Sequence, residues 1–224
     1  MATAAPAKLQ GAAQRFVLHD ISWEAYQTFL KVLQDRPIRL TYDRGTLELM
    51  TPLSIHERYR ALIGRMIDAI TEEMDVRVVA VGSTTFHREE LKRGLEPDQC
   101  YYFASADKVT DWARIDLDVD APPDLAIEID VTSDSRQRLG IYAALKIPEV
   151  WRFDGERLDV LQLEEAGGYQ VVPRSGIFVF LPMEELGRFL QQHAIGDDTR
   201  WTKAFRRWFR ETILPRVQDE RAGE

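Results

Sequence analysis

The chain has 224 residues, of which 45% are hydrophobic and 29% charged, so its composition excludes a fibrous or disordered protein and predicts one large or two small domains. The formal net charge of −8 argues against a protein that coats nucleic acid without specificity, but it does not exclude an enzyme whose carboxylates hold a divalent metal. The single cysteine, Cys100, excludes an internal disulfide, and no apolar run reaches the roughly 18 residues of a membrane span. We therefore expect a soluble cytoplasmic protein.

The first third of the chain predicts a tail, two helices and a β-hairpin. Residues 1–15 lack the residue order of a secretory signal and are expected to form a flexible tail. Ser22 is a favourable helix N-cap, and the apolar residues behind it recur at helical spacing. The expected elements are, in order, a helix from Ser22 to the stop at 35–37, strands over 38–42 and 46–50, and a helix over 55–74.

The rest of the chain predicts further strands, with helices between and after them. Residues 76–81 are rich in valine, which is typical of a strand buried on both faces. The other expected strands are 84–87, 99–103, 124–131, 149–153, 157–163 and 169–172, and the expected helices are 135–145, 183–192 and 198–214. No repeat or linker divides the chain. We predict one α/β domain, a mixed central sheet flanked by helices, over residues 16–195, with a C-terminal helix and tail over 196–224 in the same domain.

Three acidic residues stand out by their positions. Asp98 follows Pro97 at the start of an expected strand, and Glu128 and Asp130 lie two residues apart within another. Because side chains alternate along a strand, Glu128 and Asp130 should point to the same face. Neighbouring carboxylates on an apolar strand repel each other, and a bound Mg²⁺ would resolve that repulsion. The alternative is a strand with one solvated face, and this pattern alone favours neither.

Other polar residues are less specific. His56, at the start of the second helix, could hold a water or a phosphate near the sheet, with Glu48 joining the acidic residues, but a polar residue at a helix start needs no such role. The alternating acids of 116–120 lack the glycine and final glutamate of a calcium loop, so we expect a solvated loop there. The sequence contains no phosphate-binding loop, dinucleotide fingerprint, H-E-x-x-H or G-x-S-x-G motif.

Three segments together carry a family resemblance. They read EPDQCYY over 96–102, PPDLAIEIDVTS over 122–133, and IYAALKIPEVWRFD over 141–154. In this combination the chain, over roughly residues 20–190, resembles the Uma-two family of restriction-endonuclease-like nucleases. The resemblance implies a mixed sheet flanked by helices with extra β-hairpins, a DNA substrate and a Mg²⁺ or Mn²⁺ cofactor.

The resemblance also implies the site residues. Asp98 matches the metal-binding aspartate that follows a proline, and Glu128 matches the second metal carboxylate. The peptide carbonyl of Ile129 would supply another oxygen. Asp130 stands where the family pattern has a lysine, and from its position it could be a third metal ligand. His56 and Glu48 match polar positions that family members place near the site.

The chain departs from the family pattern at its lysine. The Glu-x-Lys lysine is replaced by Asp130, and the position where many relatives carry a helical lysine, four residues before Tyr142, is Arg138. Arginine can clamp a phosphate but cannot act as a general base, because its pKa lies above 12. Two hypotheses result: a metal-dependent DNA endonuclease, expected to be a homodimer, or a weakened or inactive nuclease fold that serves as a nucleic-acid-binding or interaction module.

The basic segment 200–210 has two readings as well. Arginines and aromatic rings could track phosphates and stack on bases. Trp201, Phe205 and Trp208 fall on one helical face, however, which favours an amphipathic helix whose rings pack on the sheet and whose arginines are solvated.

Overall fold

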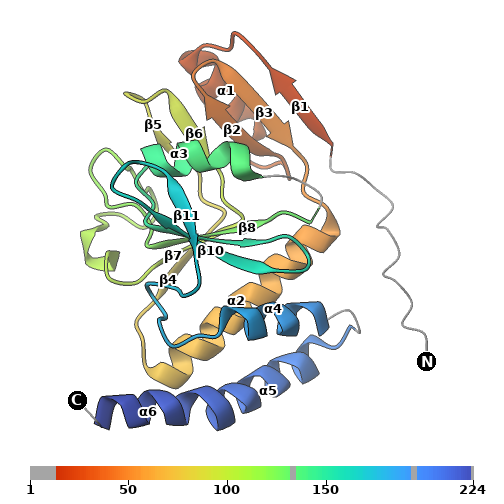
Figure 1. Cartoon of the computed structure of the whole chain (residues 1–224). Helices are drawn as coiled ribbons and strands as arrows, with labels where there is room; N and C mark the ends of the chain where they lie inside the picture. Colours follow the sequence, from red (N-terminus) through yellow and green to blue (C-terminus); the bar gives the residue numbers. More distant parts are fainter. Residues whose placement is uncertain (1–13, 132–134, 193–195, 223–224) are drawn as a thin grey trace.

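The computed structural model describes residues 14–131, 135–192 and 196–222, and in this part of the chain the strands form two sheets (Figure 1). The larger sheet has six strands in the order β11-β10-β9-β8-β7-β4, which are antiparallel except for the parallel pair β8–β9. Their bounds are β4 Val79–Gly82, β7 Gln99–Tyr102, β8 Leu125–Ile129, β9 Glu149–Phe153, β10 Leu158–Leu163 and β11 Tyr169–Val172. A mixed sheet flanked by helices is the predicted fold class, which is confirmed.

The smaller sheet has five antiparallel strands in the order β1-β3-β2-β6-β5. Their bounds are β1 Arg15–Leu18, β2 Arg39–Asp43, β3 Thr46–Met50, β5 Phe86–Arg88 and β6 Arg93–Leu95. Helix α1 (Trp23–Leu33) packs on this sheet through Trp23 and Tyr26, and the Ser22 side chain accepts a hydrogen bond from the Ala25 amide as the predicted N-cap. The hairpin β2–β3 is as expected. Its pairing with β6, which completes a second sheet, joins residues about 50 apart in the sequence and could not be predicted from local sequence patterns.

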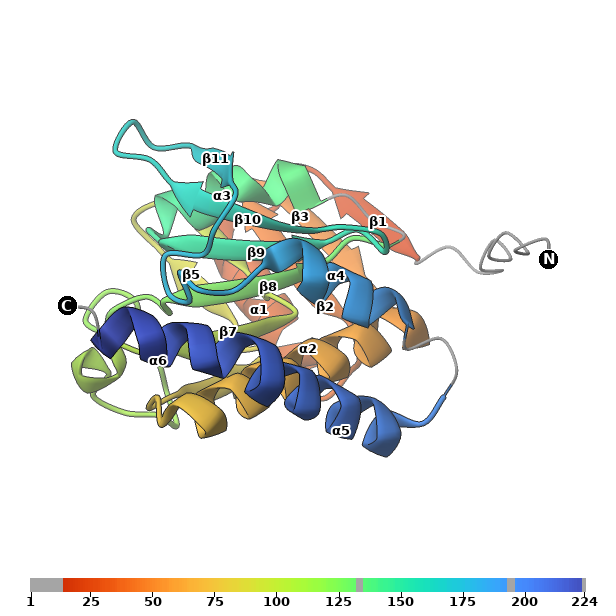
Figure 2. The same ribbon diagram turned by 60° about the horizontal axis from the view of Figure 1, so that its bottom comes forward.

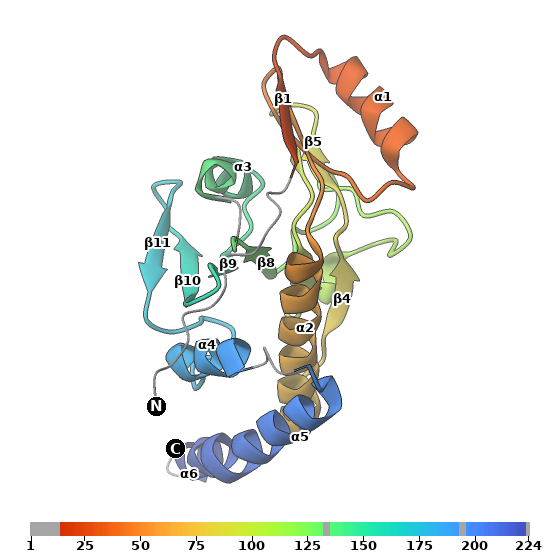
Figure 3. The same ribbon diagram turned by 90° about the vertical axis from the view of Figure 1, so that its right-hand side faces the viewer.

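Helices cover both faces of the larger sheet (Figures 2 and 3). One face packs against α2 (Ser54–Met74), α4 (Met183–Gln192), α5 (Asp198–Trp208), a π-helical turn (Phe209–Ile213) and α6 (Leu214–Ala222). The other face is crossed by the connection from β8 to β9, which contains a 3₁₀ turn (Ser135–Arg138) and α3 (Leu139–Ala144). Strand β8 therefore lies between two layers of helix and is buried at all five positions.

The alternation along β8 separates two cores. Leu125, Ile127 and Ile129 belong to the core formed with α2 and the C-terminal helices, whereas Ala126 belongs to the core beneath α3. Glu128, two residues after Ala126, shares its face and is 0% exposed. A solvated face on this strand is therefore ruled out, and a carboxylate is fully buried under α3.

Two local expectations are wrong. Residues 76–81 do not form a doubly buried strand, because β4 begins at Val79, lies at the sheet edge and is only partly covered. The acidic loop 116–120 is not wholly solvated either. Asp120 is 4% exposed and accepts hydrogen bonds from the amides of Thr110 and Asp116, both at 2.8 Å, so it organises the loop through backbone contacts.

The basic C-terminal segment packs largely as the amphipathic reading expects. Trp201, Phe205 and Phe209 are buried in the core against α2. Two of its arginines are not simply solvated. Arg206 forms ion pairs with Glu72 and Glu73 near the end of α2, and Arg210 forms one with Glu73. Arg210 Nε lies 2.7 Å from Glu73 Oε2, and Arg206 Nη1 lies 3.2 Å from Glu73 Oε1.

Candidate active site

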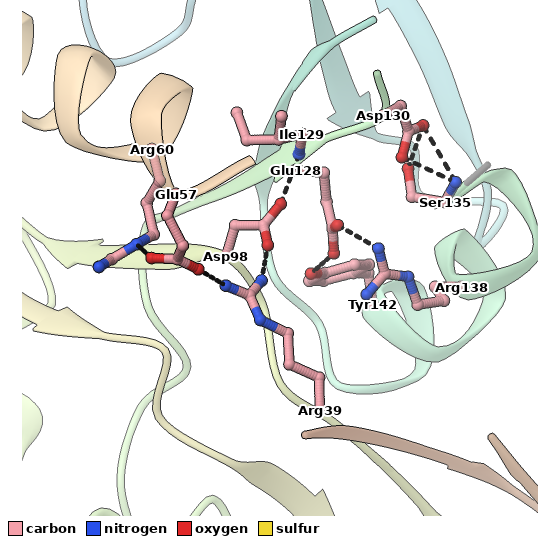
Figure 4. A network of polar contacts seen from close by, with 10 residues as sticks. All are labelled: Arg39, Glu57, Arg60, Asp98, Glu128, Ile129, Asp130, Ser135, Arg138 and Tyr142. Carbon is pink, nitrogen blue, oxygen red and sulfur yellow. Dashed lines mark hydrogen bonds and ion pairs between the residues drawn. The ribbon is translucent and has the colours of Figure 1, made fainter. Parts of the chain in front are cut away.

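Asp98 is fixed at the start of β7 by bonds to the neighbouring strand β8. Its amide donates to the Ile127 carbonyl at 3.1 Å, and its Oδ2 accepts from the Ile129 amide at 2.5 Å. The β7–β8 register pairs Gln99 with Ile127, so the next pair in the same register is Asp98 with Glu128. Directly opposed residues in an antiparallel pair have neighbouring side chains on one face. The two carboxylates accordingly lie side by side (Figure 4).

Arg39 neutralises Asp98 from the other sheet. Its Nη1 forms an ion pair with Asp98 Oδ1, and its Nη2 donates to Glu57 Oε1 at 2.9 Å. Glu57, in the first turn of α2, also accepts from Arg60 at 2.7 Å. Arg39 is 7% exposed and Asp98 is 2% exposed, so a buried ion pair joins β2 of the smaller sheet to β7 of the larger one.

Glu128 is held by two donors from the crossover that follows it. The Arg138 guanidinium and the Tyr142 hydroxyl each donate to one of its carboxylate oxygens. Burial raises the pKa of Glu128, and the positive charge of Arg138 and the Tyr142 hydrogen bond oppose that rise. The spacing of four between Arg138 and Tyr142 places both on one side of the chain as it enters α3, facing β8 (Figure 4).

Asp130 does not join the other two acids. Strand β8 ends at Ile129, although the Asp130 amide still donates to the Phe153 carbonyl at 2.7 Å. The Asp130 carboxylate instead accepts from the Ser135 amide at 3.0 Å and from the Ser135 hydroxyl at 2.8 Å, which anchors the 3₁₀ turn after β8. Within the described residues, no group of three or more His, Cys, Asp or Glu side chains could hold a metal ion. The expected convergence of three acids is therefore wrong, and two converge.

The other two expected site residues, His56 and Glu48, come from α2 and β3. His56 is 1% exposed in the first turn of α2, and burial together with the positive charge of Arg39 lowers its pKa, so the imidazole is neutral at pH 7. Glu48, in β3, forms an ion pair with Arg15 at 2.6 Å. Glu48 thus contacts a residue of β1 instead of the two central carboxylates.

Each buried carboxylate has an arginine partner that lines an open cavity. Arg39 lines a cleft of 610 Å³ between α1, β2 and the start of α2, together with Glu57 and Glu96. Arg138 lines a second cavity of 480 Å³, together with Glu48 and Arg15. Solvent therefore reaches both arginines, although the carboxylates behind them are covered.

Sequence reasoning missed three residues of this site. Tyr142 lies four residues after Arg138, and this spacing signals that both side chains reach the same strand. Arg39 and Glu57 carry no comparable local signal, because they meet Asp98 only through the packing of the two sheets and α2.

The sequence model of the Uma2 family, described as "Putative restriction endonuclease", matches residues 23–189. The chain belongs to the Uma2 family. The match runs from the start of α1 into α4 and contains Asp98, Glu128 and the residues that neutralise them, so the site lies within the family domain. No curated protein matches the sequence. Among the described residues, no helix has the length and apolar character that crossing a membrane requires.

Proposed function

We propose that this Uma2 protein is a metal-dependent DNA endonuclease that hydrolyses phosphodiester bonds, with Asp98 and Glu128 as its metal carboxylates. The observation that carries the proposal is the pair itself. Two buried carboxylates lie side by side at the ends of adjacent strands, in a chain of the family described as "Putative restriction endonuclease". Burying two such charges together is costly without positive charge beside them, and a divalent metal is one source of that charge.

The donor set fits Mg²⁺ or Mn²⁺. Mg²⁺ prefers carboxylate oxygens, is commonly held by one or two carboxylates, and keeps several waters. Asp98 and Glu128 supply that number, and the Ile129 carbonyl, from the residue whose amide holds Asp98, is the proposed third protein oxygen. Asp130 is left out, because its carboxylate is engaged by Ser135.

Such a metal, when bound, would stabilise negative charge on the phosphate as a Lewis acid. The residues around it would have separate roles. The Ile129 amide and the Tyr142 hydroxyl orient the two carboxylates. Arg138 faces the 480 Å³ cavity and is the proposed clamp for a phosphate oxygen. His56, neutral and buried, is the proposed holder of a water or phosphate. Arg138 cannot take a proton from water, so it does not replace the missing lysine as a base.

A specific observation favours a second candidate function. Each carboxylate already has an arginine partner, Asp98 with Arg39 and Glu128 with Arg138, so the charges balance without a metal. A nuclease fold that has lost catalysis and serves as a nucleic-acid-binding or interaction module would have this arrangement too.

Plasmid cleavage tests the first function. Supercoiled DNA incubated with the wild type and Mg²⁺ or Mn²⁺ is expected to become nicked or linear, and D98N is expected to leave it intact. D130N is the matched control, because it changes an acid two residues from Glu128 that lies outside the pair. Linear product before nicked product would support the proposed homodimer, which cuts both strands in one encounter. Equal cleavage by the wild type and D98N would contradict the assignment.

The variant R138K separates the two candidate functions. In a competent nuclease, lysine keeps the positive charge and restores the residue type of many relatives, so cleavage is expected to persist or increase. If the chain is an inactive module, the wild type does not cleave and R138K gains nothing. Measuring the melting temperature of both proteins shows whether a loss of cleavage reflects a loss of folded protein.

A further inference from the structure

The position of Arg39 bears on how a metal would reach Asp98. The two oxygens of Asp98 have different partners: Oδ2 accepts from the Ile129 amide, and Oδ1 is paired with the Arg39 guanidinium. The backbone bond holds the carboxylate in place, so Oδ1 is the oxygen that faces a cation. In this structure that cation is Arg39, whose charge is permanent at physiological pH.

A second carboxylate offers Arg39 an alternative partner. Arg39 Nη2 lies 2.9 Å from Glu57 Oε1, and the Glu57 side chain is 40% exposed, whereas the Asp98 side chain is 2% exposed. Both Arg39 and Glu57 line the 610 Å³ cleft. The Arg39 guanidinium thus contacts both the buried Asp98 carboxylate and the exposed Glu57 carboxylate. It can release Asp98 Oδ1 and still be paired with Glu57.

The other buried carboxylate, Glu128, is enclosed more completely than Asp98. Glu128 is 0% exposed and is held by Arg138 and Tyr142 together, both from the segment directly after it in the chain. The Arg39 pair instead joins two sheets and shares its arginine with a surface acid. Of the two arginines at the site, Arg39 is the one that forms ion pairs with both a buried and an exposed carboxylate.

We propose that Arg39 is a resident counterion that competes with the divalent metal for Asp98 Oδ1 and moves onto Glu57 when the metal binds. This inference rests on the proposed metal-dependent function. Two cations at one carboxylate oxygen repel each other, and in a buried site this repulsion is screened weakly. The apparent metal affinity is then lowered by the fraction of molecules in which Arg39 has released Asp98. In the metal-free protein the same contact keeps a buried charge paired.

Calorimetric titration with Mn²⁺ tests the competition in three variants. R39Q removes the competitor and is expected to bind Mn²⁺ roughly tenfold more tightly than the wild type. E57Q removes the alternative partner and is expected to bind more weakly. R60Q is the matched control, because Arg60 contacts Glu57 but not Asp98, and its affinity should stay within about twofold of the wild type, the change expected from losing a distant charge.

The outcomes separate this inference from the function beneath it. Equal affinity in the wild type and R39Q, or weaker binding in R39Q, overturns the competition and leaves the metal site standing. Absence of Mn²⁺ binding in both folded proteins overturns the competition and the metal-dependent function together. An R60Q protein that tightens as much as R39Q shows a general charge effect and also overturns the competition.

A measurement on the wild type avoids dependence on the folding of R39Q. The side-chain Nε–H signal of Arg39 in an NMR spectrum can be assigned by its loss in R39K, which keeps the charge. Addition of Mg²⁺ is expected to shift the Arg39 signal and to leave the Arg188 signal, from a surface pair with Glu184, unchanged. An Arg39 signal that stays in place up to saturating Mg²⁺ overturns the proposal.

Discussion

Two regions of the molecule use the same ion pair, arginine with glutamate, in opposite surroundings. In the candidate site Glu128 and Arg138 have side chains that are 0% and 9% exposed. Between α2 and the C-terminal helices, Glu73 meets Arg210, whose side chain is 60% exposed. Water reaches the second pair from the Arg210 side, and Glu73, 11% exposed, keeps Arg206 as a second partner. The buried pair therefore cannot be broken cheaply, although a surface pair can.

The buried pair of Glu128 and Arg138 is not explained by stability alone. Buried ion pairs seldom add net stability, and apolar residues of similar size often serve a fold as well. The face of β8 that carries Glu128 also carries Ala126 and packs against Ile141 and other apolar residues of the core beneath α3. A carboxylate in this place needs another reason, and we attribute it to the proposed metal site.

Breaking the buried pair should have the largest effect. R138A leaves Glu128 charged and buried beneath α3, so we expect a loss of about 3–5 kcal/mol in the free energy of unfolding. Urea denaturation measures this loss. The double variant E128Q/R138A removes the stranded charge and should recover much of the stability. A loss below about 1 kcal/mol in R138A, the level of a surface pair, would contradict the burial argument.

A smaller effect is expected from the second donor to Glu128. Y142F removes one hydroxyl from a buried charged acceptor, and we expect a loss of about 1–3 kcal/mol. Y169F is the matched control, because the Tyr169 hydroxyl donates to the neutral backbone carbonyl of Ile147. We expect Y169F to lose less stability than Y142F in the same denaturation experiment. A larger loss in Y169F would contradict the claim that the charge of Glu128 strengthens the Tyr142 hydrogen bond.

The surface pair should show the smallest effect, and a dependence on pH. Hydrogen bonds from Arg210 lower the pKa of Glu73 below its ordinary value of 4.5. A carboxylate with a lowered pKa in the folded state contributes stability above its ordinary pKa and loses it as the pH falls through the folded value. R210Q should therefore cost at most about 1 kcal/mol at pH 7, and nothing once the pH is well below 4.5. A difference from the wild type that grows as the pH falls would have the wrong sign.

The sequence predicted most of the helices and strands, although β1 and β6 were not expected, and it predicted long-range contacts poorly. Helical spacing located α1 and α2, and the Ser22 cap marked the start of α1, because these signals lie within a few residues of each other. Asp98 and Glu128 were expected together because of the family resemblance, and the structure places them side by side in the β7–β8 register. Their roles in metal binding and catalysis stay predictions.

Other contacts depended on where a strand ends and how two sheets meet. The alternation rule put Asp130 beside Glu128, but the Asp130 carboxylate is engaged by Ser135 of the turn that follows β8. Arg39 meets Asp98 from a different sheet, 59 residues earlier in the sequence, and neither residue's neighbours encode that meeting. Local periodicity specifies the face of a strand, and only the assembled fold specifies what covers it.

The measurement that tests the central claim most directly is Mn²⁺ titration of the wild type, D98N, E128Q and D130N. If Asp98 and Glu128 hold one metal together, the wild type binds Mn²⁺, both D98N and E128Q lose most of that affinity, and D130N retains it. Circular dichroism of each variant establishes that the protein is folded during the titration. Binding that survives in folded D98N and E128Q, or that is lost only in D130N, would contradict the account.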